Sequence, residues 1–177
     1  SNRIRENVGS GLMVELCEGH TIHSNLIYGN GTDIAGIPFN HTQAGIVLWR
    51  GANNNFIYHN TVYDNAGWQL NISGRDSDGI YSDGNIAQNN IFFPESGQGA
   101  IFVRGNAVSD INGNRISYNC LGPEGTNFVR WGAADDSTNP TGYSTYDAWE
   151  SQYATDTSES STTNHIEADP SIISLVN

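Results

Sequence analysis

The sequence predicts an all-β fold: a solenoid of stacked parallel strands. Three observations support this prediction. A nine-residue pattern recurs between residue 2 and about residue 131, and a second short apolar segment follows each copy. The composition, with 20 glycines and many Asn, Ser, Thr and Asp residues, favours short strands and tight turns over helices. Such units cannot bury their inner faces alone and must stack on one another.

The first element of each unit is the pattern I-x-x-N-x-I-x-x-N. Its copies are IHSNLIYGN from Ile22, IYHNTVYDN from Ile57, IAQNNIFFP from Ile86 and INGNRISYN from Ile111, and NRIREN at the start matches a second half. The repeated asparagines form a first set (Asn2, Asn25, Asn60, Asn89, Asn114) and a second set (Asn7, Asn30, Asn65, Asn119). Members of the first set are 23, 35, 29 and 25 residues apart, so the length variation is expected in loops.

The second element of each unit is a short apolar strand. These segments are GLMVEL from Gly11, GIVLW from Gly45, GWQLNI from Gly67, GAIFV from Gly99 and, more loosely, NFVRW from Asn127. Because side chains alternate along a strand, stacked strands place apolar residues in inward columns. The columns predicted are Ile22, Ile27, Ile57, Val62, Ile86, Ile91, Ile111 and Ile116, joined by Leu12, Val14, Ile46, Leu48, Leu70 and Ile72.

The repeated asparagines are expected at the corners between strands. Asn tolerates the bent backbone conformations of corners better than other non-glycine residues. Stacked from unit to unit, the amides can also form a hydrogen-bonded ladder. A structural role for these asparagines is therefore favoured over a binding role.

Through these copies the chain resembles the right-handed parallel β-helix proteins with pectate-lyase-like repeats. The resemblance covers residue 2 to about residue 131 and implies a right-handed parallel β-helix of about five coils. It also implies a secreted or cell-surface bacterial protein that binds or degrades polysaccharide. The resemblance is specific for fold and weak for activity.

Two regions are expected, the repeats at 1–132 and a C-terminal cap at 133–177 that packs on the solenoid. The cap loses the repeat and is rich in Ser, Thr and Asp; STYDAWESQY at 144–153 has Tyr146, Trp149 and Tyr153 at helical spacing. The segment HIEADPSII is similar to the tails of bacterial β-helix proteins. Because the chain opens in mid-repeat, we expect either the C-terminal part of a longer protein or self-association through an open first coil.

Charge and cysteine placement exclude several classes. The net charge of -12, with seven arginines and no lysine, repels phosphate backbones, so we expect no nucleic-acid partner. No apolar run reaches the ~20 residues of a membrane span, so no membrane insertion is expected. Cys17 and Cys120 belong to coils about 19 Å apart at ~4.8 Å per coil, so both should be free thiols.

Two irregular loops are candidates for a binding edge, residues 31–43 and residues 73–84. The second loop contains Asp76, Asp78 and Asp83, whose carboxylates could hold Ca²⁺. The alternative is an ordinary solvated acidic turn, and no cofactor is required by any other feature.

An outward column is the candidate substrate-binding surface. The alignment of copies places Arg5, Tyr28, Tyr63 and Phe92 at one position and Glu6, Gly29, Asp64 and Phe93 at the next. Aromatic rings suit the apolar face of a sugar, and arginines and carboxylates suit its polar groups. Trp49, at the end of GIVLW, is a further binding candidate. The alternative is that one of the columns turns inward and stacks as core.

The candidate catalytic groups follow from the chemistry of polysaccharide cleavage. A lyase needs a base and a cation: His59 beside Asp64, His23 or His41 could supply the base, and Arg50 or Arg75 the cation. The absence of lysine excludes family members that use a lysine base. A hydrolase needs two carboxylates, from a pool of Asp33, Asp64, Asp76, Asp78 and Asp83. The competing hypotheses are a lyase or hydrolase, a non-catalytic carbohydrate-binding or adhesive module, and a structural stalk.

Overall fold

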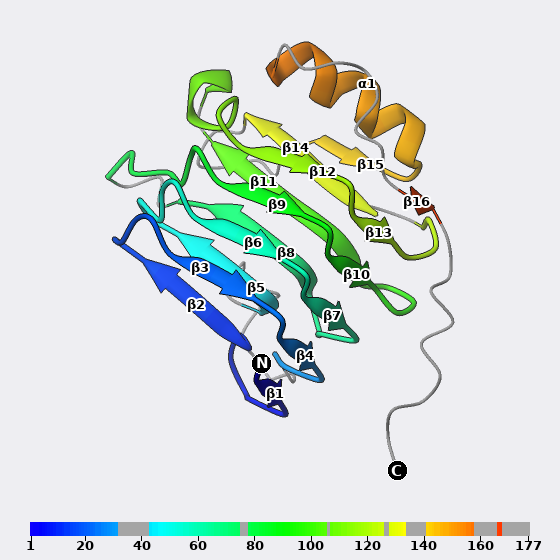
Figure 1. Ribbon diagram of the computed structural model, residues 1–177. Coiled ribbons are helices and arrows are strands. Elements are labelled where there is room, and N and C mark those ends of the chain that lie inside the picture. The colour runs from blue at the N-terminus through cyan, green and yellow to red at the C-terminus, as the bar shows by residue number, and fades with distance from the viewer. Residues whose placement is uncertain are drawn as a thin grey trace.

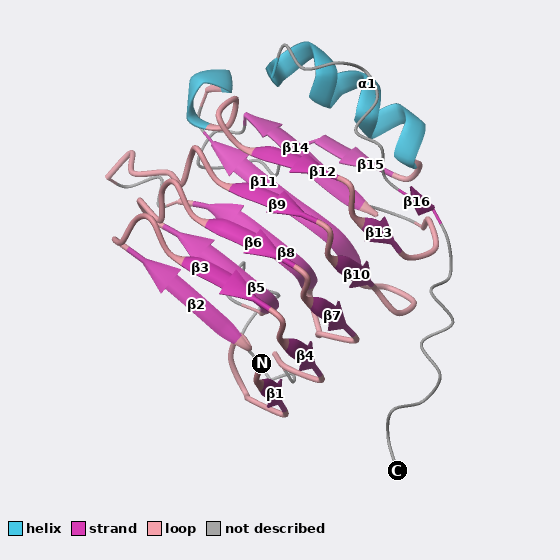
Figure 2. Ribbon diagram, in the orientation of Figure 1, coloured by secondary structure: helices cyan, strands magenta, loops and turns pink. Residues whose placement is uncertain are grey.

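The computed structural model describes residues 1–31, 43–74, 78–105, 107–125, 128–133, 141–157 and 166–167. Short strands dominate this part of the chain, and a single α-helix lies near its C-terminal end (Figures 1 and 2). The strands belong to three sheets, in which all pairs are parallel except β14 with β15. The predicted all-β, parallel architecture is confirmed at this level.

The first sheet has the order β1-β4-β7-β10-β13-β16. Its strands are β1 (Arg3–Arg5), β4 (Leu26–Tyr28), β7 (Thr61–Tyr63), β10 (Ile91–Phe93), β13 (Cys120–Leu121) and β16 (Ile166–Glu167). The long-strand sheet contains β2 (Leu12–Glu15), β5 (Ala44–Trp49), β8 (Trp68–Ser73), β11 (Gly99–Gly105), β14 (Val129–Ala133) and β15 (Thr141–Tyr143). The third sheet contains β3 (Thr21–His23), β6 (Phe56–Tyr58), β9 (Ile86–Gln88) and β12 (Arg115–Ser117).

The chain visits the three sheets in rotation. From β2 to β14 each strand of the long-strand sheet is followed by one of the third sheet and then one of the first. A short 3-10 helix, Val108–Asp110, lies between β11 and β12. Each new round pairs in parallel with the previous one, as β4 does with β7 and β7 with β10. This rotation is the connectivity that the repeat predicts for stacked units.

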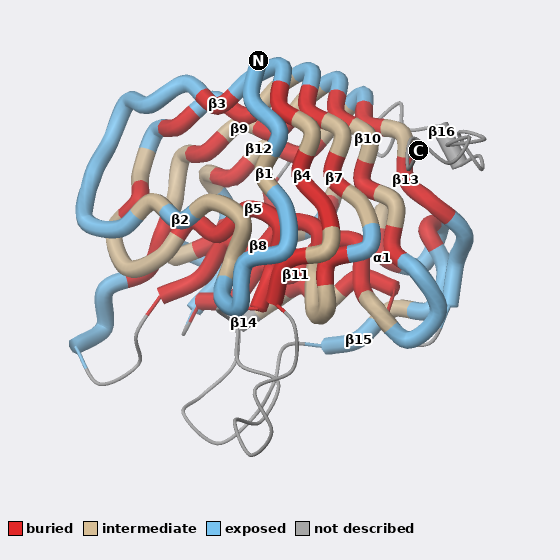
Figure 3. The backbone as a smooth tube through the Cα atoms, turned by 90° about the horizontal axis from the view of Figure 1, so that it is seen from below, coloured by how far each residue is buried: buried red, intermediate tan, exposed pale blue. Residues whose placement is uncertain are grey.

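The core lies between the three sheets and is built of stacked apolar columns (Figure 3). Ile22, Ile57 and Ile116 are buried as predicted, and so are Ile27 and Val62. In the long-strand sheet Ile46, Leu48, Leu70 and Ile72 are fully buried, whereas Leu12 and Val14, on the outermost strand, are partly buried.

The predicted columns are wrong at β9 and β10, where the register differs by one residue. Ile86 and Ile91 are only half-buried, and Ala87 and Phe92 occupy the inward positions with no exposed surface. Ile111 is buried as predicted, but it precedes β12 and belongs to no strand. Within β12, Ile116 pairs with Ala87. A slip of one residue exchanges the two faces of a strand.

The asparagines form three hydrogen-bonded ladders. The first runs Asn2, Asn25, Asn60, Asn90, Asn119, with side-chain amide bonds of 2.9 to 3.0 Å. The second joins Asn7, Asn30 and Asn65 and continues to Gln69. The third joins Asn55, Asn85 and Asn114. The predicted ladder is confirmed in kind, but its membership was wrong for Asn89, Asn114 and Asn119.

The backbone explains why Asn89 is excluded from the ladder. The residue before each member of the first ladder, from the second coil onward, has a positive φ: Ser24, His59, Asn89 and Tyr118, at 53° to 55°. These four side chains are exposed, while the next residue turns its amide inward. Asn89 is thus the left-handed corner residue and Asn90 the rung of the ladder.

The C-terminal helix α1 (Tyr146–Thr157) covers the end of the stack opposite the N-terminus (Figure 1). It overlaps the helix predicted at 144–153, and its Tyr146, Trp149 and Tyr153 are buried as their spacing predicts. The ring centroid of Trp131, on β14, is 5.0 Å from that of Tyr153. The Tyr153 hydroxyl accepts the backbone N–H of Ile116, so α1 satisfies a donor on the last strand of the third sheet.

Both cysteines are free thiols, as predicted; Cys17 is exposed and Cys120 half-buried. Among the described residues no helix is long and apolar enough to cross a membrane.

Candidate functional site: a column and a cavity on the first sheet

The outer face of the first sheet carries most of the described binding candidates. The register aligns Arg5 with Tyr28, Tyr28 with Tyr63 and Tyr63 with Phe93. Phe92, predicted in this column, instead points into the core, and Phe93 takes its place. This correction follows from the same one-residue slip that affects β9 and β10, because adjacent residues of a strand face opposite sides.

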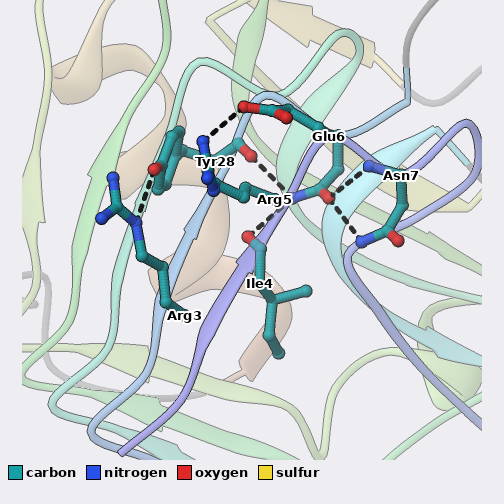
Figure 4. A network of polar contacts seen from close by, with 7 residues as sticks. Arg3, Ile4, Arg5, Glu6, Asn7 and Tyr28 are labelled. Atoms are coloured by element: carbon teal, nitrogen blue, oxygen red, sulfur yellow. Dashed lines mark hydrogen bonds and ion pairs between the residues drawn. The ribbon is translucent and has the colours of Figure 1, made fainter. Parts of the chain in front are cut away.

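The N-terminal half of this column is tied together by its own side chains. The rings of Tyr28 and Tyr63 stack with centroids 4.9 Å apart. The Arg3 guanidinium lies over the Tyr28 ring, and Arg3 Nε donates to the Tyr28 hydroxyl at 2.6 Å (Figure 4). Arg5 pairs with Glu6 at 2.6 Å. Because the ring faces are used within the column and Tyr28 is only 7% exposed, a ligand here would meet the edges of the rings.

Tyr63 is the one ring of this column with an unsatisfied hydroxyl. Its oxygen is buried and has no hydrogen-bond partner among the described residues. Burial raises the pKa of Tyr63, and neighbouring Tyr28 raises it further, while Arg3 acts in the opposite direction. The neutral hydroxyl is therefore the favoured form, able both to donate and to accept.

Beyond Phe93 the column ends at a cavity of about 530 Å³ between the loops that follow β10 and β13. Its lining includes Glu95, Gln98, Glu124 and Phe128. Ile91 pairs with Cys120 and Phe92 with Leu121, so Pro94-Glu95 on one coil corresponds to Pro123-Glu124 on the next. Two glutamates from successive coils thus line one cavity.

Glycine permits the close approach of the two loops. Gly122 lies against the ring of Phe93, and a Cβ there would come within 2.8 Å of Phe93 Cδ2. Contacts this short are not seen for real Cβ atoms, so a larger residue would push the second loop away from the first.

Hydrogen bonds connect the cavity to Asp64. Gln98 Nε2 donates to Asp64 Oδ1 at 3.1 Å, and Gln98 Oε1 accepts the backbone N–H of Glu95 at 2.9 Å. Glu124 Oε1 accepts the backbone N–H of Tyr146, the first residue of α1, at 2.6 Å. Within the described part of the chain, nothing pairs with the Glu95 carboxylate. One acid is therefore held in place and the other is available.

His59 lies away from this cavity. It occupies the corner before β7, whereas Asp64 occupies the corner after it, and both have positive φ. The predicted pair therefore flanks opposite ends of one strand. His59 meets Tyr58 edge-on at 5.2 Å, and His23 stacks on the other side of Tyr58 at 5.1 Å. This imidazole and tyrosine group faces outward from the third sheet, beside Phe56, which is 46% exposed.

The remaining predicted residues lie on other parts of the fold. Trp49 is half-buried on β5, in register with Glu15 and Ser73. Arg50 holds Asp78 through two nitrogens, at 2.6 and 2.7 Å. Predicted residues His41, Arg75 and Asp76 lie outside the described residues.

Asp78 and Asp83, the two candidate calcium ligands among the described residues, interact with different partners. Asp78 pairs with Arg50, while Asp83 accepts the backbone N–H of Gly113 at 3.0 Å. In the part of the chain that the structure describes, no three His, Cys, Asp or Glu side chains converge as metal ligands. Asp83 and Asp110 line a second cavity of about 490 Å³. The calcium site remains a prediction.

Sequence reasoning missed the two cavity acids. Glu95 and Glu124 follow proline at matching positions, directly after the apolar pairs Phe92-Phe93 and Leu121-Gly122. That repeated Pro-Glu is the signal that could have found them once the register of β10 was right.

Comparison with known proteins provides no further assignment: no family model, no curated protein and no solved structure matches this chain.

Proposed function

We propose that the protein is an extracellular, right-handed parallel β-helix of the pectate-lyase-like type that binds polysaccharide along the first sheet. The observation that carries the proposal is the column of Tyr28, Tyr63 and Phe93 that ends at a cavity lined by Glu95 and Glu124. Parallel stacking repeats the same surface from coil to coil, which suits a ligand that is itself a repeating extended chain.

The chemistry of the surface favours sugar hydroxyls as its ligands. The Glu95 carboxylate and the Gln98 amide offer acceptors and donors, and Phe93 and Phe128 offer apolar contact. The net charge of -12 disfavours polyanions, so a neutral glycan is the proposed substrate class. Arg3 and Arg5, at the opposite end of the column, are the groups that could hold an acidic sugar.

Glycoside hydrolysis is the second candidate, favoured by the two carboxylates in one cavity. Glycosidases use two carboxyl groups beside the scissile bond; in the retaining type one protonates the leaving oxygen and the other attacks the sugar. Glu124, held by the Tyr146 N–H, suits the positioned nucleophile, and Glu95 suits the acid. A lyase using His59 has less support, because His59 and the cavity lie at different ends of the first-sheet strands.

A polysaccharide array that records binding and product release separates the candidates. We expect retention of a neutral glycan by the wild-type protein and at least tenfold weaker binding by Glu95→Gln/Glu124→Gln. Glu18→Gln, an exposed glutamate far from the cavity in sequence, is the matched control. New reducing ends that require both acids would establish the hydrolase, whereas unsaturated products would establish a lyase. If no glycan binds, the structural or adhesive module is correct, and the stacked Tyr28 and Tyr63 rings serve stability alone.

A further inference from the structure

The N-terminal end of the stack differs from its C-terminal end. Strands β1, β2 and β3 are the outermost members of the three sheets, and each pairs with one strand only within the described residues. Helix α1 covers the other end. Figure 3 shows the N-terminal stretch of chain as largely exposed.

The core columns are open at this end. Ile4 is half-exposed, while Ile27 and Val62, in the same column, have no exposed surface. Leu12 and Val14, which continue the columns of Ile46 and Leu48, are likewise only partly buried, whereas Ile46 and Leu48 are fully buried. The apolar columns therefore stop without a covering layer of described residues.

The asparagine ladders have a direction, and the direction identifies what fits the open end. In every rung that joins two asparagines, the backbone N–H and the Nδ2 of one donate to Oδ1 of the asparagine in the next coil, as Asn2 does to Asn25 and Asn7 to Asn30. No described residue donates to Oδ1 of Asn2 or Asn7. The open end thus presents two hydrogen-bond acceptors, five residues apart on either side of β1.

From this polarity we propose that the N-terminal end is an interaction surface for one further parallel coil of polypeptide that carries asparagine at two positions five residues apart. Its strand pairs with β1, and its two asparagines donate to Asn2 and Asn7. Its apolar residue between them covers Ile4. The proposal concerns a surface separate from the column and cavity and does not depend on glycan binding.

A second copy of the chain in head-to-head contact does not meet these requirements. It would bring the Oδ1 acceptors of one N-terminal end against those of the other, with no donor between them. It would also bring Arg3 and Arg5 near the same arginines of the second copy, which like-charge repulsion disfavours. The occupant must therefore present the donor side of a coil.

A peptide with the sequence of residues 56–66, FIYHNTVYDNA, is a suitable probe because its Asn60 already donates in this way to Asn90 of the next coil, and its Asn65 lies five residues further on. Binding of the fluorescently labelled peptide to the full chain is measured by anisotropy. The control peptide carries Asn60→Ala and Asn65→Ala, and the control protein carries Asn2→Ala and Asn7→Ala. Far-ultraviolet circular dichroism confirms that the variant protein is folded.

We expect saturable binding of the natural peptide, weakened roughly 30-fold by either pair of alanines, because two amide hydrogen bonds are lost. Amide chemical-shift changes should be confined to residues 1–24. Equal affinity for the two peptides, no binding at the solubility limit, or sedimentation showing a dimer that the Asn2→Ala/Asn7→Ala variant abolishes would each overturn the proposal.

Discussion

Replacing Asn90 by alanine should destabilise the protein far more than removing the side chain of its neighbour Asn89. The Asn90 amide nitrogen donates to Ile57 O, Gln88 O and Asn119 Oδ1 at 2.9 to 3.0 Å. Its oxygen accepts from the backbone N–H and Nδ2 of Asn60. All of these partners except Gln88 belong to neighbouring coils, and Asn90 itself is 1% exposed.

The magnitude follows from the groups that alanine would leave without partners. The Asn60 N–H and the Ile57 carbonyl would each lose a partner inside the stack, and an unsatisfied buried group costs about 1–3 kcal/mol. With the further lost amide bonds, Asn90→Ala should lower the free energy of unfolding by about 3–5 kcal/mol. For a chain of this size the melting temperature should fall by roughly 10 °C.

The matched control is Asn89→Gly, which removes the same side chain from an exposed corner with φ of 55°. Glycine adopts that conformation without strain, so the free energy of unfolding should change by less than about 0.5 kcal/mol. Urea unfolding followed by circular dichroism measures both variants. A loss below 1 kcal/mol for Asn90→Ala, or a larger loss at Asn89, would refute the ladder register.

Three further predictions test the core, the cap and the column. Phe92→Ala should destabilise the protein by about 3–5 kcal/mol in urea unfolding and Phe93→Ala by clearly less, because only Phe92 is fully buried; equal losses would contradict the corrected strand register. Trp149→Ala should cost about 3–5 kcal/mol and increase proteolysis near α1, since its indole is fully buried; unchanged proteolysis would show that α1 does not cap the stack. Because the pKa of Tyr63 is raised in the folded state, its contribution to stability is complete below the unfolded value near 10 and is lost as the pH rises through the folded value. Tyr63→Phe should therefore flatten the alkaline part of a stability-against-pH curve, and an identical curve for the variant would argue against the buried hydroxyl.

The repeat allowed much of the fold to be predicted. Alternating apolar residues around Asn25 and Asn60 indicate two short strands and a corner, and the structure has β3, β4, β6 and β7 at those positions. The second apolar segments correspond to the long-strand sheet. These predictions succeeded because each local pattern had one apolar face and one polar face.

The prediction failed where both faces of a strand were apolar. In the segment Ile86 to Phe93 the apolar residues are adjacent, as Ile86-Ala87 and Ile91-Phe92-Phe93, and two adjacent asparagines are available for one ladder position. The structure places small Ala87 between Ile57 and Ile116. Whether Ala87 packs well there depends on Ile57 and Ile116 in the neighbouring coils, which the segment Ile86 to Phe93 does not contain.

The same reason limits the prediction of the site. Arg5, Tyr28, Tyr63 and Asp64 were found because they occupy matching positions of the repeat, but the catalytic histidine and arginine candidates came from residue type and loop position alone. Glu95 and Glu124 are 29 residues apart in sequence and share a cavity only because β10 and β13 pair in register. Asp64 is connected to this cavity through Gln98, whose side-chain amide donates to the Asp64 carboxylate from the next coil.

The sequence by itself determined that short strands repeat, that they stack in parallel and that asparagines mark their corners, because all three follow from the local repeat of apolar residues and asparagines. Only the tertiary structure decided which of two adjacent residues faces inward, which asparagine joins which ladder and which acids meet. Those choices depend on the side chains of the coil above and below, where burial and hydrogen-bond satisfaction act together across about 5 Å of stacking.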